Sequence, residues 1–238
     1  MIMSLSPELE AKLEDVKATL TELLEKNEKV VFANSFGAED MVLTDVIARF
    51  FKGKITIFSL DTGRLPVETY TVMQQAEEKY DIKLKVYYPD TEAVETYVRT
   101  NGINAFYQSV DMRKGCCGVR KMQPLRRALA EQDAWITGLR SAQSVTRTEL
   151  AKFEYDEVFG LNKCNPLSDW SETETWDYIK QLEVPYNELH DKNYPSIGCA
   201  PCTRAISAGE DVRAGRWWWE NPESKECGLH AGKVTKLS

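Results

Sequence analysis

Short apolar segments alternate with helical hydrophobic patterns from the N-terminus to about residue 140, and this alternation restricts the chain to few folds. The segments that read as strands are residues 29–34, 54–60, 82–88 and 135–137. Between them, apolar residues recur at helical spacing in residues 38–51, 66–80 and 119–131. Strands that alternate with helices predict right-handed βαβ units and a doubly wound, mainly parallel α/β sheet. Ligands of such sheets bind beyond the carboxyl ends of the strands.

The chain of 238 residues contains no linker rich in Pro, Gly or Ser, no low-complexity run and no internal repeat. We therefore predict a single domain that covers residues 1–238. After about residue 165 the pattern becomes helical and irregular, and Ser171 and Glu174 have the spacing of a capping box. We expect residues 203–238 to form a mobile C-terminal segment near the ligand edge of the sheet.

The formal net charge of −7 argues against general nucleic-acid binding, but it leaves room for a local basic pocket that binds a small anion. Residues 1–10 lack the basic and apolar regions of a secretory signal. No run approaches the roughly 18 consecutive apolar residues of a membrane span. We expect a cytoplasmic protein that binds neither nucleic acid nor membrane, and we also expect a homo-oligomer, although the sequence does not give the number of chains.

Two pairs of cysteines dominate the motifs: Cys116 is followed directly by Cys117, and Cys199 and Cys202 form a CxxC. Cysteines in such motifs of a cytoplasmic protein more often bind metal or do chemistry than form structural disulfides. Four thiolates suit zinc or an iron–sulfur cluster, and the adjacent pair is atypical for zinc. A dithiol redox motif at the CxxC, or two inert buried cysteines at 116 and 117, remains open at this point.

Cys227 lies in the segment Glu226-Cys227-Gly228-Leu229-His230, near the end of the chain. Neighbouring Lys and His side chains can lower a thiol pKa and so raise the fraction of the reactive thiolate. The hypothesis is a redox nucleophile, and a structural cysteine is the alternative. Cys164 has no partner motif, and we interpret it as structural.

Several residues that suit an anion follow the predicted strands. Ser35-Phe36-Gly37 connects the first strand to a helix, where backbone N–H groups can face an anion, although a simple strand–helix turn has the same pattern. Leu60-Asp61-Thr62-Gly63 ends the second strand, and Asp-Thr-Gly is also a competent turn. Arginines match phosphate and sulfate oxygens, and solvated surface charge is the alternative for each. The arginines concerned here are Arg140 and Arg147.

Together these segments resemble the assimilatory adenylyl-sulfate (APS) reductases, which are related to 3'-phospho-APS (PAPS) reductases. The resemblance covers nearly the whole chain, and its most specific element is Cys116-Cys117-Gly118-Val119-Arg120-Lys121 paired with Cys199-Ala200-Pro201-Cys202. It implies an adenine-nucleotide alpha-hydrolase-like fold with a C-terminal redox tail, and one [4Fe–4S] cluster per chain on those four cysteines. It further implies that Cys227 is the nucleophile. The substrate-binding residues implied are Lys121, Arg213, Arg216 and His230 around the phosphosulfate, and Ser35, Phe36, Gly37, Leu60, Asp61 and Gly63 around the nucleotide, with Arg140 and Arg147 in a matching stretch.

The resemblance implies reduction of APS to sulfite and AMP through an S-sulfocysteine on Cys227, released by thioredoxin or glutaredoxin. One departure concerns the more distant ATP pyrophosphatases, whose loop reads Ser-Gly-Gly-x-Asp-Ser: here Phe36 and Glu39 argue against ATP hydrolysis. The alternatives are a PAPS reductase with an accessory cluster and a redox- or metal-sensing thiolate protein. A sulfur transferase for RNA fits the acidic balance less well.

Overall fold

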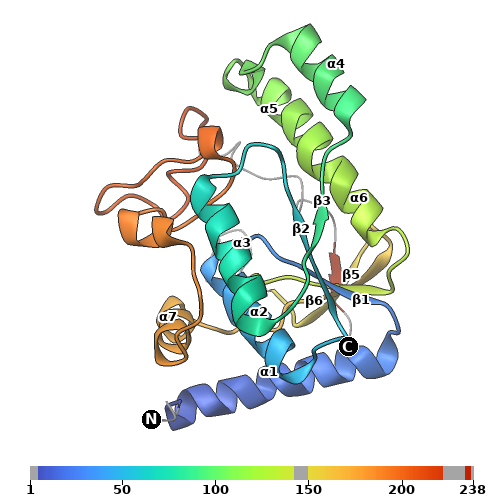
Figure 1. The fold of residues 1–238 in the computed structure, drawn as a ribbon, viewed down its shortest axis with the longest axis vertical. Coiled ribbons are helices and arrows are strands. Elements are labelled where there is room, and N and C mark those ends of the chain that lie inside the picture. Colours follow the sequence, from blue (N-terminus) through green and yellow to red (C-terminus); the bar gives the residue numbers. More distant parts are fainter. Residues whose placement is uncertain (1–4, 142–149, 222–233, 237–238) are drawn as a thin grey trace.

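A seven-stranded sheet with the strand order β3-β2-β1-β4-β6-β5-β7 forms the centre of the computed structural model, which describes residues 5–141, 150–221 and 234–236 (Figure 1). The strands are β1 (Val30–Ala33), β2 (Thr56–Leu60), β3 (Lys85–Tyr87), β4 (Ala134–Ile136), β5 (Phe153–Asp156), β6 (Leu161–Cys164) and β7 (Val234–Lys236). The pairs β1–β2, β1–β4, β2–β3 and β4–β6 are parallel. The prediction of a mainly parallel α/β sheet is therefore confirmed.

The far edge of the sheet differs from the pattern that the sequence suggested. There β5 pairs antiparallel with β6 and with β7. Sequence analysis missed all three strands, which come after the regular βα alternation. Gly160, which has a φ of +71°, lies in the tight connection between β5 and β6, and this φ favours glycine.

Helices cover both faces of the sheet, as a doubly wound fold requires. They are α1 (Pro7–Lys26), α2 (Ala38–Phe50), α3 (Val67–Tyr80), α4 (Thr91–Asn101), α5 (Val110–Cys117), α6 (Gln123–Leu129) and α7 (Glu172–Gln181). The larger core packs α1, α2, α3 and α7 against one face, with Phe32 and Ile136 at its centre. A smaller core on the other face packs α6 against Phe58 and Trp135. Figure 1 shows α1 running across the end of the molecule opposite α4 and α5.

Two helix starts follow the expected capping chemistry. The Ser6 side chain accepts a hydrogen bond from the Leu9 amide at the start of α1, where Pro7 is the first helical residue. Ser171 and Glu174 form a complete capping box at the start of α7. The capping-box prediction is thus confirmed.

Helices α4 and α5 were not predicted, although their N-caps are readable. The side chain of Asp90 accepts from the Ala93 amide, and that of Ser109 accepts from the Met112 amide. No residue of α4 is buried, so this helix does not contribute to the cores on the two faces of the sheet. A π-helical segment, Gly118–Met122, joins α5 to α6. The predicted helix 119–131 is therefore the second half of a longer helical rod.

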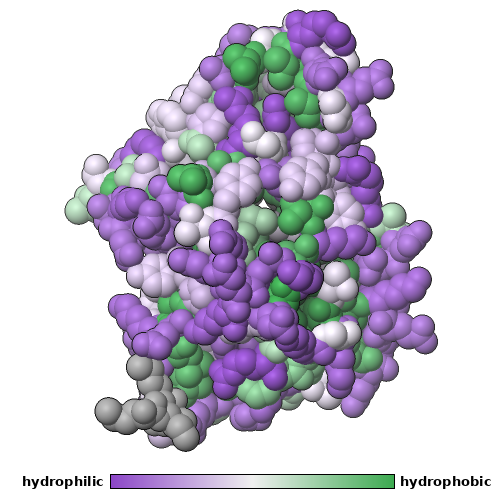
Figure 2. Space-filling view, in the orientation of Figure 1, coloured by the Kyte–Doolittle hydropathy of each residue, from purple (hydrophilic) through white to green (hydrophobic). Residues whose placement is uncertain are grey.

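In Figure 2 hydrophilic residues dominate the face that is shown, and hydrophobic side chains form separate groups. Within the described part of the chain, no helix is both long and apolar enough to cross a membrane.

Candidate active site

A cavity of about 230 Å³ opens at the carboxyl ends of β1, β2 and β4. This is the edge at which ligands of parallel sheets bind. Four of the residues predicted from sequence line the cavity, namely Ser35, Gly37, Leu60 and Lys121. Most of its wall is apolar, and sequence reasoning did not identify these residues: Phe58, Leu65, Leu125, Trp135, Leu139 and Ile197.

The loop after β1 presents a helix N-terminus to this cavity. Gly37 is the N-cap of α2 and makes no side-chain capping bond. Phe36 has a φ of +62° and buries its ring in the larger core, while its amide donates to Asn34 Oδ1 over 2.7 Å. Phe36 therefore shapes the loop from below, and its side chain does not line the cavity.

Asp40, which sequence analysis did not single out, occupies the donor groups of this loop. Its Oδ2 accepts from both the amide and the hydroxyl of Ser35, each over 2.6 Å. Burial raises the pKa of Asp40 to about 6, against the opposing effect of the Ser35 hydrogen bonds. A Cβ placed on Gly138 would lie 2.2 Å from Asp40 Oδ1, so the backbone after β4 approaches this carboxylate as only glycine can.

The turn after β2 connects the cavity to the cysteines. Asp61 accepts hydrogen bonds from the Gly63 amide and the Tyr70 hydroxyl, and it does not line the cavity. Gly63 has a φ of +71°. Thr62 lines the cavity, and its Oγ1 lies 3.2 Å from the Sγ of Cys199. Asp61 and Gly63 thus form the turn, and Thr62 makes the contact.

The four predicted metal ligands line one small cavity of their own. Cys116 and Cys117 end α5. Cys199 precedes the short 3₁₀ helix Ala200–Cys202, and Cys202 is its last residue. Burial raises the pKa of Cys202 to about 12, so this thiol keeps its proton at neutral pH unless a metal displaces it. Among the residues that the structure describes, no three His, Cys, Asp or Glu side chains are close enough to hold a single metal ion.

Backbone pairing fixes the second cysteine pair beside Arg216. Thr203 and Arg216 form an antiparallel bridge, and the Trp217 amide donates to the Cys202 carbonyl over 3.1 Å. The Arg216 guanidinium donates to Ser196 Oγ over 3.2 Å. A Cβ placed on Gly198 would lie only 2.4 Å from Arg216 Nη2. Glycine at 198 therefore permits this position of Arg216. Gly198 itself lines the cavity at the carboxyl ends of the strands.

Lys121 lines both cavities, the one at the carboxyl ends of the strands and the one that the four cysteines line. Its neighbour Arg120 lines the cysteine cavity and donates from Nη1 to the Thr62 carbonyl over 2.7 Å. Arg64 and Arg113 lie in the same wall. The basic residues that follow Cys117 in sequence are thus placed between a sulfur-rich cavity and the ligand edge of the sheet.

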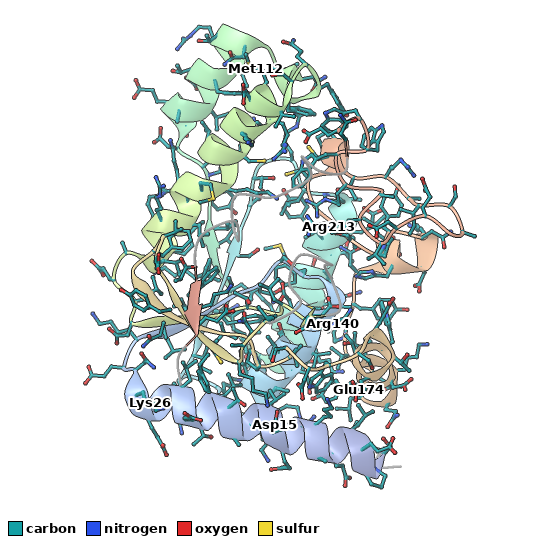
Figure 3. The ribbon with its side chains drawn as sticks, turned by 180° about the vertical axis from the view of Figure 1, so that it is seen from behind. Asp15, Lys26, Met112, Arg140, Glu174 and Arg213 are labelled. Atoms are coloured by element: carbon teal, nitrogen blue, oxygen red, sulfur yellow. The ribbon has the colours of Figure 1, made fainter. Side chains whose placement is uncertain are left out.

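Other predicted residues lie elsewhere. Arg140 is buried and forms an ion pair with Glu39 over 2.7 Å. Arg140 does not line the cavity at the carboxyl ends of the strands. Arg213 lies on the C-terminal segment and donates its amide to Asp211 over 2.8 Å, and it lines neither cavity; Figure 3 shows it apart from Arg140. Cys227, which we predicted to be the nucleophile, and the predicted substrate-binding residues His230 and Arg147 lie outside the described residues.

Comparison with known proteins decides the family. Residues 29–205 match the model of the phosphoadenosine phosphosulfate reductase domain. The chain belongs to this family. Two relatives of this chain are both named adenosine 5'-phosphosulfate reductase. The protein of Allochromatium vinosum is 57% identical over 89% of this chain and 82% of its own length, and that of Burkholderia cepacia is 52% identical over 98% and 93%.

Solved structures agree with this assignment of the reductase family. A phosphoadenylyl-sulfate reductase from Candida auris, in complex with phosphate, superposes with a TM-score of 0.69 at 25% identity, over 85% of this chain and 98% of that one. The FMN adenylyltransferase of Candida glabrata has a TM-score of 0.56 at 15% identity, over 92% of this chain and 77% of its own. The second likeness concerns the fold alone.

Proposed function

We propose that the protein reduces adenylyl sulfate to sulfite and AMP in assimilatory sulfate reduction, with a [4Fe–4S] cluster on Cys116, Cys117, Cys199 and Cys202. One observation carries the proposal: Lys121 lines both the nucleotide cavity and the cavity of the four cysteines. A cation in that position can serve an anionic substrate on one side and a negatively charged metal–thiolate centre on the other. The names of the two bacterial relatives support the same reaction.

The nucleotide half of the substrate fits the larger cavity. Its apolar wall, which includes Phe58 and Leu125, suits a purine ring, while the backbone at Gly37, the N-cap of α2, suits a phosphate. The sulfate end would then point toward Lys121 and Arg216. Positive charge is needed there because a phosphosulfate carries anionic oxygens that repel an incoming thiolate.

The donor set fits an iron–sulfur cluster. Four cysteines line one cavity, yet in the described residues no three potential ligands converge on a single ion. A cluster of several irons holds its thiolates farther apart than one zinc ion does, and sulfur-only donors suit it. When bound, it would supply local charge and join α5 to the 3₁₀ helix Ala200–Cys202. Thr62, Arg120 and Lys121 surround this place.

The chemistry itself needs only thiols. The Cys227 thiolate attacks the sulfur of adenylyl sulfate, an S–S bond forms, the S–O bond to the phosphate breaks, and AMP leaves with the electron pair. A thiolate of thioredoxin or glutaredoxin then attacks the Cys227 sulfur, and sulfite leaves. The second thiol of that dithiol resolves the mixed disulfide, so the dithiol is oxidised and the Cys227 thiolate is restored.

The first test is turnover of adenylyl sulfate compared with its 3'-phosphorylated form, with thioredoxin as reductant. Adenylyl sulfate should be strongly preferred. Mixed without reductant, enzyme and substrate should give a chain heavier by one SO₃ unit, located at Cys227 by peptide mass spectrometry. The Cys227→Ser variant should bind AMP as the wild type does and form neither adduct nor sulfite. Sulfite production by that variant would refute the role of Cys227.

The cluster is tested separately by iron content. The wild type should be brown, absorb at about 400 nm and hold about four irons per chain. Cys199→Ser should lose this iron. Cys164→Ala is the matched control, because Cys164 is buried in the larger core far from the cysteine cavity and should leave the iron content unchanged. A colourless protein that contains zinc would overturn the cluster assignment.

The second candidate function is reduction of the 3'-phosphorylated nucleotide, which the family model and the Candida auris structure are named for. The names of the two bacterial relatives favour adenylyl sulfate without the 3'-phosphate. The turnover comparison decides between the two substrates.

A further inference from the structure

A row of buried polar residues lies on the sheet face that also lines the nucleotide cavity. Register pairs Trp135 of β4 with Lys163 of β6, and Lys163 in turn with Glu154 of β5. Lys163 and Glu154 are 3% and 2% exposed and form an ion pair over 3.3 Å. Buried ion pairs contribute little net stability, so such a pair calls for another explanation.

The pair fixes the orientation of a neighbouring amide, that of fully buried Asn165. The Nδ2 of Asn165 donates to Glu154 Oε2 over 3.0 Å and to the Ala151 carbonyl over 2.9 Å. The Ala151 carbonyl is an acceptor only, and Glu154 Oε2 also faces the ammonium group of Lys163 over 3.3 Å. The amide nitrogen must therefore face them, and the amide oxygen must face the opposite way.

The amide oxygen meets Thr137, the residue that follows β4. Thr137 Oγ1 donates to Asn165 Oδ1 over 2.6 Å. Because side chains alternate along a strand, Thr137 lies on the same face as Trp135, and both line the nucleotide cavity. The single hydroxyl proton of Thr137 is thus committed to Asn165, and only its lone pairs remain for a ligand.

We propose that Thr137 is a specificity-determining acceptor for the nucleotide, and that Lys163, Glu154 and Asn165 are positioning residues that set this polarity. The group recognised is a hydrogen-bond donor of the nucleoside, either the amine of the base or a ribose hydroxyl. A site with the opposite polarity would favour a carbonyl at the same place. This inference rests on the proposed function, since it concerns the same cavity.

The test measures dissociation constants by calorimetry for AMP and for three analogues that each lack one donor group: purine riboside monophosphate, which has hydrogen in place of the amine, 2'-deoxy-AMP and 3'-deoxy-AMP. One analogue should bind the wild type about tenfold more weakly than AMP through loss of one hydrogen bond, and this analogue identifies the donor. Thr137→Val should bind AMP about tenfold more weakly and should no longer discriminate against that analogue. Thr137→Ser, which keeps the hydroxyl, should restore the discrimination.

A second variant tests the positioning residues without leaving one buried charge alone. The pair Glu154→Leu with Lys163→Met removes both charges and the acceptor that Glu154 offers to Asn165. The ratio of the dissociation constant of that analogue to that of AMP should then fall toward the ratio measured for Thr137→Val. Circular dichroism and unfolding midpoints confirm that each variant is folded. Unchanged AMP affinity in Thr137→Val, or equal discrimination in that variant and the wild type, would overturn the inference. Failure of the wild type to bind AMP would instead count against the proposed function.

Discussion

At the scale of single residues, Asp40 shows how the site differs from a simple anion-binding loop. A helix N-terminus with a serine amide and hydroxyl is a ready place for a phosphate oxygen. Here the Asp40 carboxylate takes both Ser35 donors and is itself buried. An internal carboxylate thus stands where an external anion would bind, and it does so at an energetic penalty that depends on pH.

The penalty predicts how stability changes with pH. The folded pKa of Asp40 is about 6 and its ordinary value is 3.8, so between these values the folded state binds more protons than the unfolded state. Stability conferred by Asp40 therefore falls as pH rises through this window and is constant above it. When the pH is raised from 5 to 8, the unfolding free energy of Asp40→Asn should rise relative to that of the wild type by about 1–2 kcal/mol. Urea unfolding at both pH values measures this, and a constant difference would contradict it.

Gly138 gives a steric prediction at the same place. Alanine there would bring Cβ to 2.2 Å from Asp40 Oδ1, so Gly138→Ala should destabilise the fold by about 1–3 kcal/mol and weaken AMP binding. Gly37→Ala is the control in the facing loop, because its Cβ would meet no heavy atom closer than 3.6 Å and its φ of −71° suits alanine. Thermal unfolding of both variants decides, and equal midpoints would contradict the close approach.

At the scale of elements, α5 connects the cysteine pair to the C-terminal segment. Arg113 of α5 and Glu220 form a bidentate ion pair with distances of 2.9 and 2.7 Å, and their side chains are 1% and 3% exposed. The Arg113 guanidinium also lies 4.4 Å from the centre of the Trp217 ring. This ion pair holds the chain after Trp217 against the helix that carries Cys116 and Cys117.

Loss of this ion pair should be costly. Glu220→Gln leaves the buried charge of Arg113 without its carboxylate and should reduce the unfolding free energy by about 3–5 kcal/mol. The control is Glu22→Gln in α1, which breaks the exposed pair with Lys26 and should change the unfolding free energy by less than about 1 kcal/mol. Chemical denaturation compares the two. Similar small effects would show that Arg113 and Glu220 do not anchor the segment.

At the scale of the whole molecule, the sequence predicted the regular part of the fold and the chemistry, and it missed connections set by tertiary contacts. Apolar runs such as 29–34 predicted the buried parallel strands because burial on both faces leaves a visible pattern. The short strands β5, β6 and β7 leave no such pattern. The spacing of the four cysteines predicted a shared site. Asp40 and Thr137 were missed, because their roles depend on hydrogen bonds to Ser35 and Asn165 that the sequence pattern does not reveal.

Removal of the metal should be felt across the molecule. The four cysteines join α5 to the 3₁₀ helix Ala200–Cys202, so a bound cluster stabilises both segments by mass action. Protein depleted of iron by oxidation and chelation should unfold at a lower urea concentration than the loaded protein. Lower pH should speed the loss of iron, since burial favours the protonated thiol of Cys202 and protons compete with the metal. Coincident urea midpoints would contradict this role.

The π-helical segment Gly118–Met122 has a consequence for how the chain length can vary. A π turn accommodates one residue more than an α turn, and it stands between the cysteine pair that ends α5 and the apolar face of α6. Deleting one residue there would restore a regular helix but would rotate Cys116 and Cys117 by about 100° relative to α6. The two cysteines would then turn away from Cys199 and Cys202. Insertions and deletions are tolerated in most surface loops. In these five residues they should abolish metal binding by the four cysteines.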